Sequence, residues 1–238
     1  MNYKDLISQD PLYNYLHSIC LHEPELAQEL RSYTIQNCRD YHMMTTPEQA
    51  QFMALIAKVT NTRNYLEIGT YTGYSTFIMA QAILNNLLLN NNNNKHTNLS
   101  PKIITIDKKL QNLEIAKNYW QAASIDIYIE AICLDAEIAL RDILEKTNSS
   151  LEPLLFDIVY IDANKSQYQT YYELTYKLLK QNGIMFIDNV FMGYNKQNKK
   201  AKTYQNNIHD FNLRLKNDTR VQISTIPFAG GLTMLYKL

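Results

Sequence analysis

Two short stretches of the chain carry acids, an amide and an amine in an order that suits metal-assisted chemistry. Asp162 follows the apolar run 158–161, and Asp188 and Asn189 follow the apolar run 184–187. Carboxylate and amide oxygens are the hard ligands that Mg²⁺ or Ca²⁺ prefer, whereas zinc prefers nitrogen and sulfur. Because two acids at buried strand ends are costly without a cation, the pattern predicts a bound divalent metal ion. The alternative is that both acids only cap helices and bind no metal.

Lys165 lies three residues after Asp162 and is expected at the same edge of the sheet. Burial and a nearby metal ion would lower the pKa of its ammonium group, and Lys165 would then serve as a general base. The alternative is a solvated lysine in a surface loop.

The stretch Asn64–Ser75 has the pattern of a loop that binds a nucleotide-like ligand. It reads NYLEIGTYTGYS, which combines the apolar run of a buried strand, a turn with Gly69 and Gly73, and helical spacing from Tyr74. Glycine lets the backbone approach a ligand closely, and the start of the helix offers free N–H groups to an anion. The spacing is not G-x-G-x-x-G, which argues against NAD. The alternative is a plain strand–helix turn.

Asp107 ends the next apolar strand after this loop. An acid at that position commonly accepts hydrogen bonds from the hydroxyls of a ribose. We therefore expect Asp107 to bind the ribose of the ligand, and the alternative is a cap on the helix that follows.

The spacing of apolar residues predicts an α/β domain with a parallel, doubly wound sheet. Strands are expected at 65–68, 103–106, 125–132, 158–161 and 184–187. Helices are expected at 74–89, 108–122, 135–144, 171–179 and 204–215, and the fourth of them is expected to stop at Asn182-Gly183. Residues 221–226 and 232–236 flank a short turn, which predicts an antiparallel hairpin.

The N-terminal part of the chain differs from the rest. Residues 1–42 are expected to form a helical extension of two helices that an α/β domain does not need, and residues 43–238 are expected to form the single domain. A third helix is expected to end near residue 58, with Thr46 as its cap, Pro47 at its first position and Gln49 completing a capping box. The polar stretch with the asparagine run 90–94 is expected to be a surface loop.

Composition excludes several other classes of protein. The 238-residue chain has a formal net charge of zero, so nothing global indicates nucleic acid or an anionic membrane as a partner. Its cysteines, Cys20, Cys38 and Cys133, form no C-x-x-C pair, which favours reduced thiols and a cytoplasmic location. The first ten residues are polar, so we expect no signal peptide, and no apolar run approaches the length of a membrane span.

Four segments together resemble the cation-dependent O-methyltransferases of the catechol and caffeoyl-CoA type. They read MMTTPEQAQF, LEIGTYTGYST, YIDANK and FIDNV, and their order and spacing match that family from Met43 to the end of the chain. The resemblance implies a class I methyltransferase with a seven-stranded sheet whose last strand is antiparallel. It also implies S-adenosylmethionine as methyl donor, a divalent cation (Mg²⁺ first, Ca²⁺ or Mn²⁺ as alternatives), a catechol-like aromatic acceptor and a homodimer, which we expect the N-terminal helices to form.

The resemblance also assigns roles to individual residues. The cofactor would be bound by nine of them, with Asp107 at the ribose and Ala136 near the adenine: Met43, Thr45, Glu67, Gly69, Tyr71, Ser75, Asp107, Ala136 and Asp162. The metal ion would be bound by Asp162, Asp188 and Asn189, and Lys165 would be the general base, so that Asp162 and Lys165 form the catalytic pair.

The chain departs from the family pattern at three places. Leu134 stands where the family often has glycine, the turn at 228–231 has no acid, and Phe191 stands where many relatives have tryptophan. These departures bear on the substrate.

Two other functions stay open on the sequence. One is methylation of a hydroxylated tRNA base, because a local basic run is formed by Lys196, Lys199, Lys200 and Lys202. The other is a non-catalytic or NAD-dependent protein, against which the missing G-x-G-x-x-G and the acid–lysine set argue.

Overall fold

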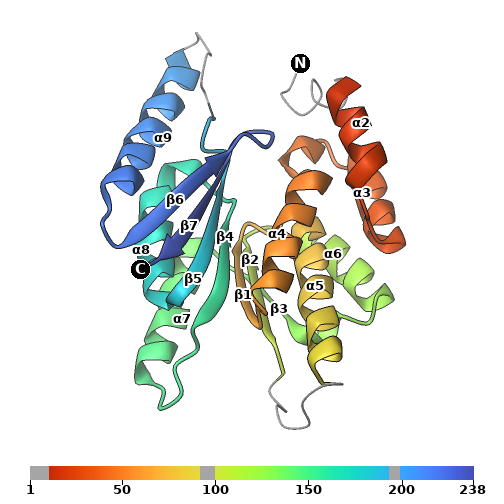
Figure 1. Ribbon diagram of the computed structural model, residues 1–238, viewed down its shortest axis with the longest axis horizontal. Helices are drawn as coiled ribbons and strands as arrows, with labels where there is room; N and C mark the ends of the chain where they lie inside the picture. Colours follow the sequence, from red (N-terminus) through yellow and green to blue (C-terminus); the bar gives the residue numbers. More distant parts are fainter. Residues whose placement is uncertain (1–10, 92–99, 193–198) are drawn as a thin grey trace. The chain divides into compact units, whose positions relative to one another are not determined.

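The structure is a computed structural model that describes residues 11–91, 100–192 and 199–238 (Figure 1). Within these residues, seven strands form one sheet in the order β3-β2-β1-β4-β5-β7-β6. Their bounds are β1 Asn64–Ile68, β2 Lys102–Asp107, β3 Ile129–Cys133, β4 Phe156–Ile161, β5 Leu179–Asp188, β6 Val221–Ile226 and β7 Leu232–Lys237. The pairs β2–β3, β1–β4 and β4–β5 are parallel, and β7 runs antiparallel to β5 and β6. The predicted α/β sheet with an antiparallel C-terminal hairpin is confirmed.

Helices connect the strands. The α-helices are α2 Pro11–Cys20, α3 Glu25–Asn37, α4 Pro47–Val59, α5 Tyr74–Asn91, α6 Leu110–Ala122, α7 Ala136–Ser149, α8 Tyr168–Leu178 and α9 Lys199–Asn217. Short 3₁₀ turns are η1 Tyr41–Met43, η2 Asp126–Tyr128 and η3 Lys165–Gln167. In the part of the chain that the structure describes, each helix is too short or too polar to span a bilayer.

The chain divides into two compact units, which we describe separately. The first unit contains residues up to Arg63 and Thr70–Cys133, and the second contains Asn64–Gly69 and Leu134–Leu238. In the first unit α4 and α5 lie side by side, and the core is formed by large apolar side chains that include Leu30, Met53, Phe77 and Trp120. In the second unit β1 and β4 are buried along nearly their whole length, and β5 is buried from Gly183 to Asp188, as expected for parallel strands that are covered on both faces.

The start of β3 differs from the sequence prediction. The strand predicted at 125–132 begins only at Ile129, because residues 123–125 form the turn that ends α6. Ser124 adopts a left-handed conformation with φ of 55°, and Ile125 N donates to Trp120 O at 3.0 Å. A short 3₁₀ turn then precedes the strand.

Several helix boundaries also differ, and α7 extends to Ser149 beyond the expected end at 144. α8 ends at Leu178 rather than at Asn182-Gly183, because Leu179 already pairs with Phe156 in the sheet. α9 begins at Lys199, and α5 extends to Asn91 and so includes the start of the asparagine run. The rest of that run, residues 92–94, lies outside the described residues.

The predicted cap of α4 is only partly correct. Thr46 occupies the N-cap position and Pro47 the first turn, but the Thr46 side chain makes no capping hydrogen bond. Its Oγ1 atom is buried without a partner. The capping box with Gln49 therefore does not form through Thr46.

Candidate active site

The end of β1 is held against the end of β4 within the second unit. Asp162 N donates a hydrogen bond to Ile68 O at 2.8 Å. Gly69 has φ of +103°, and a Cβ atom there would lie 2.1 Å from Asp162 O. Glycine is therefore required here, because a side chain would collide with the backbone of a predicted catalytic residue.

In the first unit, Asp107 binds the loop that follows β1. Its Oδ2 atom accepts a hydrogen bond from Tyr71 N at 2.8 Å, and its Oδ1 atom accepts one from Lys109 N at 2.8 Å. The N-cap position of α6 is Lys109, so the alternative prediction of a helix cap for Asp107 is wrong. The carboxylate instead joins the end of β2 to the glycine loop.

The other predicted cofactor residues of the first unit lie near the ends of helices. Ser75 is buried in the first turn of α5, and Thr45 is buried just before α4. Met43 ends η1 and is 50% exposed. Whether Met43 and Thr45 contact a cofactor stays a prediction.

In the second unit, the predicted metal ligands follow two adjacent parallel strands. Ile161 of β4 pairs with Ile187 of β5, so Asp162 and Asp188 come next on the two strands at the same edge. The two strands that carry the predicted metal ligands are therefore neighbours in the sheet. Asn189 follows directly in a left-handed conformation with φ of 57°.

Lys165 forms an ion pair with Asp162 in this cluster. The distance from Lys165 Nζ to Asp162 Oδ1 is 2.5 Å, and both side chains are largely buried. Lys165 Nζ also lies 5.5 Å from the centroid of the Tyr168 ring. Burial, the largest single effect, favours the neutral amine, but attraction to Asp162, Tyr168 and Asp188 outweighs it, and the pKa of Lys165 is raised above its usual value. The expectation that burial would lower this pKa is therefore wrong, because the nearby acids have the larger combined effect.

Two tyrosines that the sequence analysis did not single out hold Asp188. The Tyr160 hydroxyl donates to Asp188 Oδ2 at 3.1 Å, and the Tyr168 hydroxyl donates to Asp188 O at 2.9 Å. Asn189 N donates to Asp188 Oδ1 at 2.8 Å. Burial, followed by the nearby acids, raises the pKa of Tyr168 although Lys165 opposes this effect, so its hydroxyl stays a donor.

The donor set in the second unit fits a hard divalent cation. Asp162 and Asp188 supply two carboxylates, and Lys165 forms an ion pair with Asp162. No three His, Cys, Asp or Glu side chains gather as a metal site in the described residues, so the metal site, with the amide of Asn189 as its third protein ligand, stays a prediction. That amide lies close to the backbone of Gly230, where a Cβ atom would be 2.7 Å from Asn189 Nδ2.

Glu67 and Ala136 lie elsewhere in the second unit. Glu67 is fully buried in β1 and pairs in register with Tyr160 of β4. Burial, with the Glu67 charge as the next effect, raises the pKa of the neighbouring Tyr65 well above its usual value. Ala136 begins α7, which Asp135 caps by accepting from Glu137 N at 3.0 Å.

The basic run and the loop before α9 are only partly described. Lys196 lies outside the described residues, and Lys199, Lys200 and Lys202 lie in the first turn of α9. Phe191 and Met192, which follow the metal-ligand strand, are about two-fifths exposed. The rest of the loop predicted to cover the acceptor, residues 193–198, is outside the described residues.

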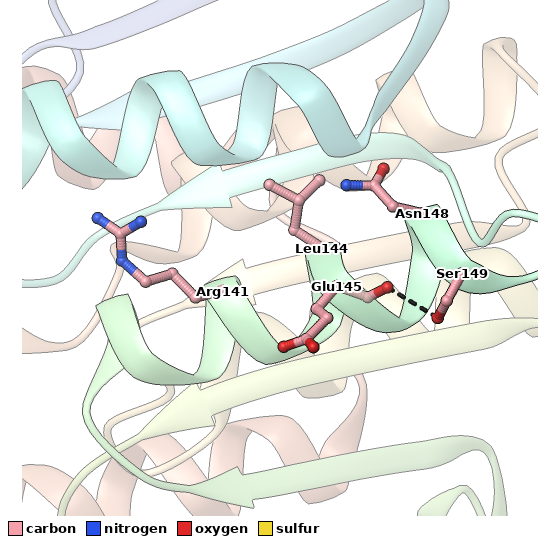
Figure 2. A pocket seen from close by; sticks show the side chains of 5 residues that line it. All are labelled: Arg141, Leu144, Glu145, Asn148 and Ser149. Atoms are coloured by element: carbon pink, nitrogen blue, oxygen red, sulfur yellow. Dashed lines mark hydrogen bonds between the residues drawn. The ribbon is translucent and has the colours of Figure 1, made fainter.

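A shallow hollow of about 460 Å³ runs along the outer side of α7 (Figure 2). It is lined by Arg141, Leu144, Glu145, Asn148 and Ser149, all from one helix. The Ser149 hydroxyl is used in a bond to Glu145 O, and Arg141 pairs with Glu137. The hollow contains no predicted site residue and no converging polar groups, so we assign it no function.

The fold and the strand-end residues together define a class I methyltransferase. The order of the seven strands, the glycine turn after β1 and the acid that ends β2 are the features that place the chain in this class. A sequence model described as O-methyltransferase matches residues 17–238, and the chain belongs to this family. The predictions of an enzyme and of an S-adenosylmethionine-dependent O-methyltransferase of the caffeoyl-CoA type are therefore confirmed at the level of the family.

Similar proteins cover nearly the whole chain. A probable caffeoyl-CoA O-methyltransferase from Arabidopsis thaliana is 28% identical over 99% of this chain and 97% of its own length. Probable caffeoyl-CoA O-methyltransferase 2 from Dictyostelium discoideum is 28% identical over 90% of this chain and 86% of its own. Among solved structures, the SAH-bound methyltransferase PaMTH1 from Podospora anserina has a TM-score of 0.79 at 21% identity, covering 97% of this chain and 95% of its own.

Proposed function

We propose that the protein transfers a methyl group from S-adenosylmethionine to one hydroxyl of a catechol-like aromatic, with the help of a divalent cation. The observation that carries this proposal is the placement of Asp162, Asp188 and Asn189 at the ends of adjacent parallel strands, with Lys165 paired to Asp162. Relatives named as caffeoyl-CoA O-methyltransferases support an acceptor with two adjacent phenolic hydroxyls.

Both units carry residues of the proposed cofactor set. In the first unit, Asp107 has accepting capacity beyond its bonds to Tyr71 N and Lys109 N, because each carboxylate oxygen has two lone pairs. This capacity suits ribose hydroxyls. In the second unit, Glu67, Gly69, Ala136 and Asp162 are the proposed contributors. Support for the cofactor comes from structural neighbours solved with SAH or SAM.

Asp162, Asp188 and Asn189 would hold the cation through oxygen atoms, in accordance with the preference of Mg²⁺. When bound, the cation would supply Lewis acidity that lowers the pKa of an acceptor hydroxyl. Tyr160 and Tyr168 orient Asp188, and Gly230 leaves space for the Asn189 amide. Lys165, beside Asp162, would stabilise the negative charge that the acceptor oxygen develops. It would receive the acceptor's proton only once a cation offsets the acids that raise its pKa.

The methyl group would pass in line from the sulfonium to the acceptor oxygen, so alignment supplies much of the rate. Phe191 and Met192 present apolar surface directly after the metal-ligand strand, which suits an aromatic acceptor. Methylation of tRNA has no support in the described residues beyond the lysines at the start of α9.

The test is methyl transfer from labelled S-adenosylmethionine to simple catechols, to caffeoyl-CoA and to hydroxylated tRNA. EDTA should abolish transfer to the diphenols while SAH affinity stays nearly unchanged, and Mg²⁺ should restore activity. Full activity in EDTA would contradict the role of the metal. Transfer to tRNA alone would contradict the proposed acceptor.

Lys165→Ala separates the role of the lysine from that of the metal. We expect a rate loss of about 10²- to 10⁴-fold with retained SAH binding, as for the removal of a general acid–base group. Lys180→Ala is the matched control, because Lys180 also forms an ion pair, at 2.6 Å, and its partner Asp157 is not a proposed site residue. Equal activity of the two variants would contradict a catalytic role for Lys165 and leave it a structural one.

A further inference from the structure

The N-terminal helical extension makes a direct hydrogen bond to the proposed cofactor loop within the first unit. Thr34 of α3 and Thr72 of the loop are both completely buried. Their hydroxyl oxygens lie 3.0 Å apart in a hydrogen bond, and Thr34 Oγ1 is also within hydrogen-bond distance of Leu30 O, at 2.8 Å. Thr72 lies between the two loop residues Tyr71 and Gly73, so α3 contacts the middle of the loop.

A second contact joins the extension to the end of the same loop. The Tyr74 hydroxyl donates to Glu23 Oε1 at 2.5 Å, and Arg31 of α3 binds both oxygens of Glu23 at 2.8 and 2.7 Å. The Glu23 side chain is almost completely buried. Burial, together with the Glu23 charge, raises the pKa of Tyr74, so this hydroxyl remains a donor. The buried carboxylate therefore accepts hydrogen bonds from Tyr74, the first residue of α5, and from Arg31 of α3.

The same loop is also held by residues of the sheet and of α6. Thr70 Oγ1 lies 2.6 Å from Thr105 Oγ1 of β2, and Trp120 Nε1 donates to Gly73 O at 3.3 Å. Tyr71 has φ of 48°, a left-handed conformation that a bulky side chain adopts only when its surroundings enforce it. The hydrogen bonds from Thr34 of α3 to Thr72 and between Glu23 of the α2–α3 connection and Tyr74 add to these restraints on the loop.

We propose that residues 23–34 are a positioning element for the cofactor loop, and that the Thr34–Thr72 and Glu23–Tyr74 bonds keep the loop in its binding-competent conformation. The inference rests on the proposed binding of S-adenosylmethionine by this loop. If the loop occupies the competent conformation for only a fraction of the time, the apparent dissociation constant rises in inverse proportion to that fraction. In the described residues the Thr34 hydroxyl is bonded to Leu30 and Thr72, neither of which is a proposed cofactor residue, so its effect is indirect.

The experiment measures SAH binding by titration calorimetry with the full chain. Thr34→Val keeps the shape of the side chain and removes the hydroxyl, and we expect SAH to bind about 2- to 10-fold more weakly, as for loss of one buried hydrogen bond. Thr34→Ser keeps the hydroxyl and should bind SAH with nearly wild-type affinity. Ser32→Ala, which removes an exposed hydroxyl from the same helix, should have no effect.

A second variant tests the other bond independently. Tyr74→Phe should also weaken SAH binding about 2- to 10-fold, whereas Tyr33→Phe on the outer side of α3 should not. Thermal unfolding of each variant verifies that it is folded at the assay temperature, and Tyr74→Phe provides the answer if Thr34→Val does not fold.

The outcomes separate this inference from the function on which it rests. Wild-type affinity in both Thr34→Val and Tyr74→Phe would overturn the positioning role while leaving the cofactor assignment intact. Equal weakening by Thr34→Ser and Thr34→Val would overturn it as well, because the hydroxyl would then be irrelevant. Absence of SAH binding by the wild-type chain would overturn the proposed cofactor and, with it, the positioning role.

Discussion

Replacing Asp107 with alanine removes a carboxylate that the end of β2 presents to two backbone amides. Tyr71 N and Lys109 N each donate to it over 2.8 Å. Lys109 is exposed, so its amide can bind water in the variant. The hydrogen bonds that are lost without replacement are therefore the one to Tyr71 N in the loop and the proposed one to the ribose. We therefore expect a larger effect on cofactor binding than on stability.

The size of the effect follows from the charge of the acceptor. A hydrogen bond to a charged group contributes about 1.5–3 kcal/mol. Each 1.4 kcal/mol corresponds to a factor of ten, so the dissociation constant for SAH should rise about 10- to 150-fold in Asp107→Ala. Asp107→Asn keeps one oxygen acceptor but directs an N–H group at the second amide, so it should also bind SAH more weakly.

Titration calorimetry with SAH measures this change, and urea unfolding at the same pH measures stability. Asp142→Asn is the matched control, because Asp142 is an exposed acid on α7 outside the proposed site. Wild-type affinity for SAH in a folded Asp107→Ala variant would refute the assignment of Asp107 to the cofactor.

Two further predictions concern stability and assembly. The hydrogen bonds from Arg220, followed by that from Tyr172, outweigh burial and lower the pKa of Asp218, so its stabilising effect is present above the usual carboxylate pKa and is lost as the pH falls through the lowered value. The free energy of unfolding in urea should therefore fall less between pH 5 and pH 2 in Asp218→Asn than in the wild type. An unchanged pH dependence in the variant would contradict this reasoning. Leu12, Tyr15 and Ile19 expose an apolar face on α2, so we expect a homodimer at micromolar concentration by light scattering and a monomer for Ile19→Glu. A monomeric wild-type chain would rule this dimer out.

Local patterns in the sequence were sufficient to predict the sheet and the strand-end residues. The apolar runs of β1, β2, β4 and β5 are short and continuous, which is typical of strands buried on both faces. An acid placed directly after such a run must lie at the carboxyl edge of a parallel sheet. Asp162 and Asp188 could therefore be placed together before the structure was known, because periodicity and connection rules depend on neighbours in sequence.

Boundaries set by contacts between distant residues could not be predicted in this way. The start of β5 at Leu179 depends on its pairing with Phe156, and the pattern at Asn182-Gly183 indicated a helix end instead. Thr46 has the residue type of a helix cap, yet its buried side chain makes no such bond. In both cases tertiary packing overrides a local preference that is worth about 1 kcal/mol or less.

The polar contacts that hold the site were decided by the tertiary structure alone. Tyr160 and Tyr168 reach Asp188 across 28 and 20 positions of the chain, and Thr34 reaches Thr72 across 38. Tyrosine and threonine at these places would equally suit an ordinary buried strand or helix. Their partners are fixed only when the strands and helices pack, because a hydrogen bond requires two atoms within about 3 Å and no spacing rule relates residues so far apart in sequence.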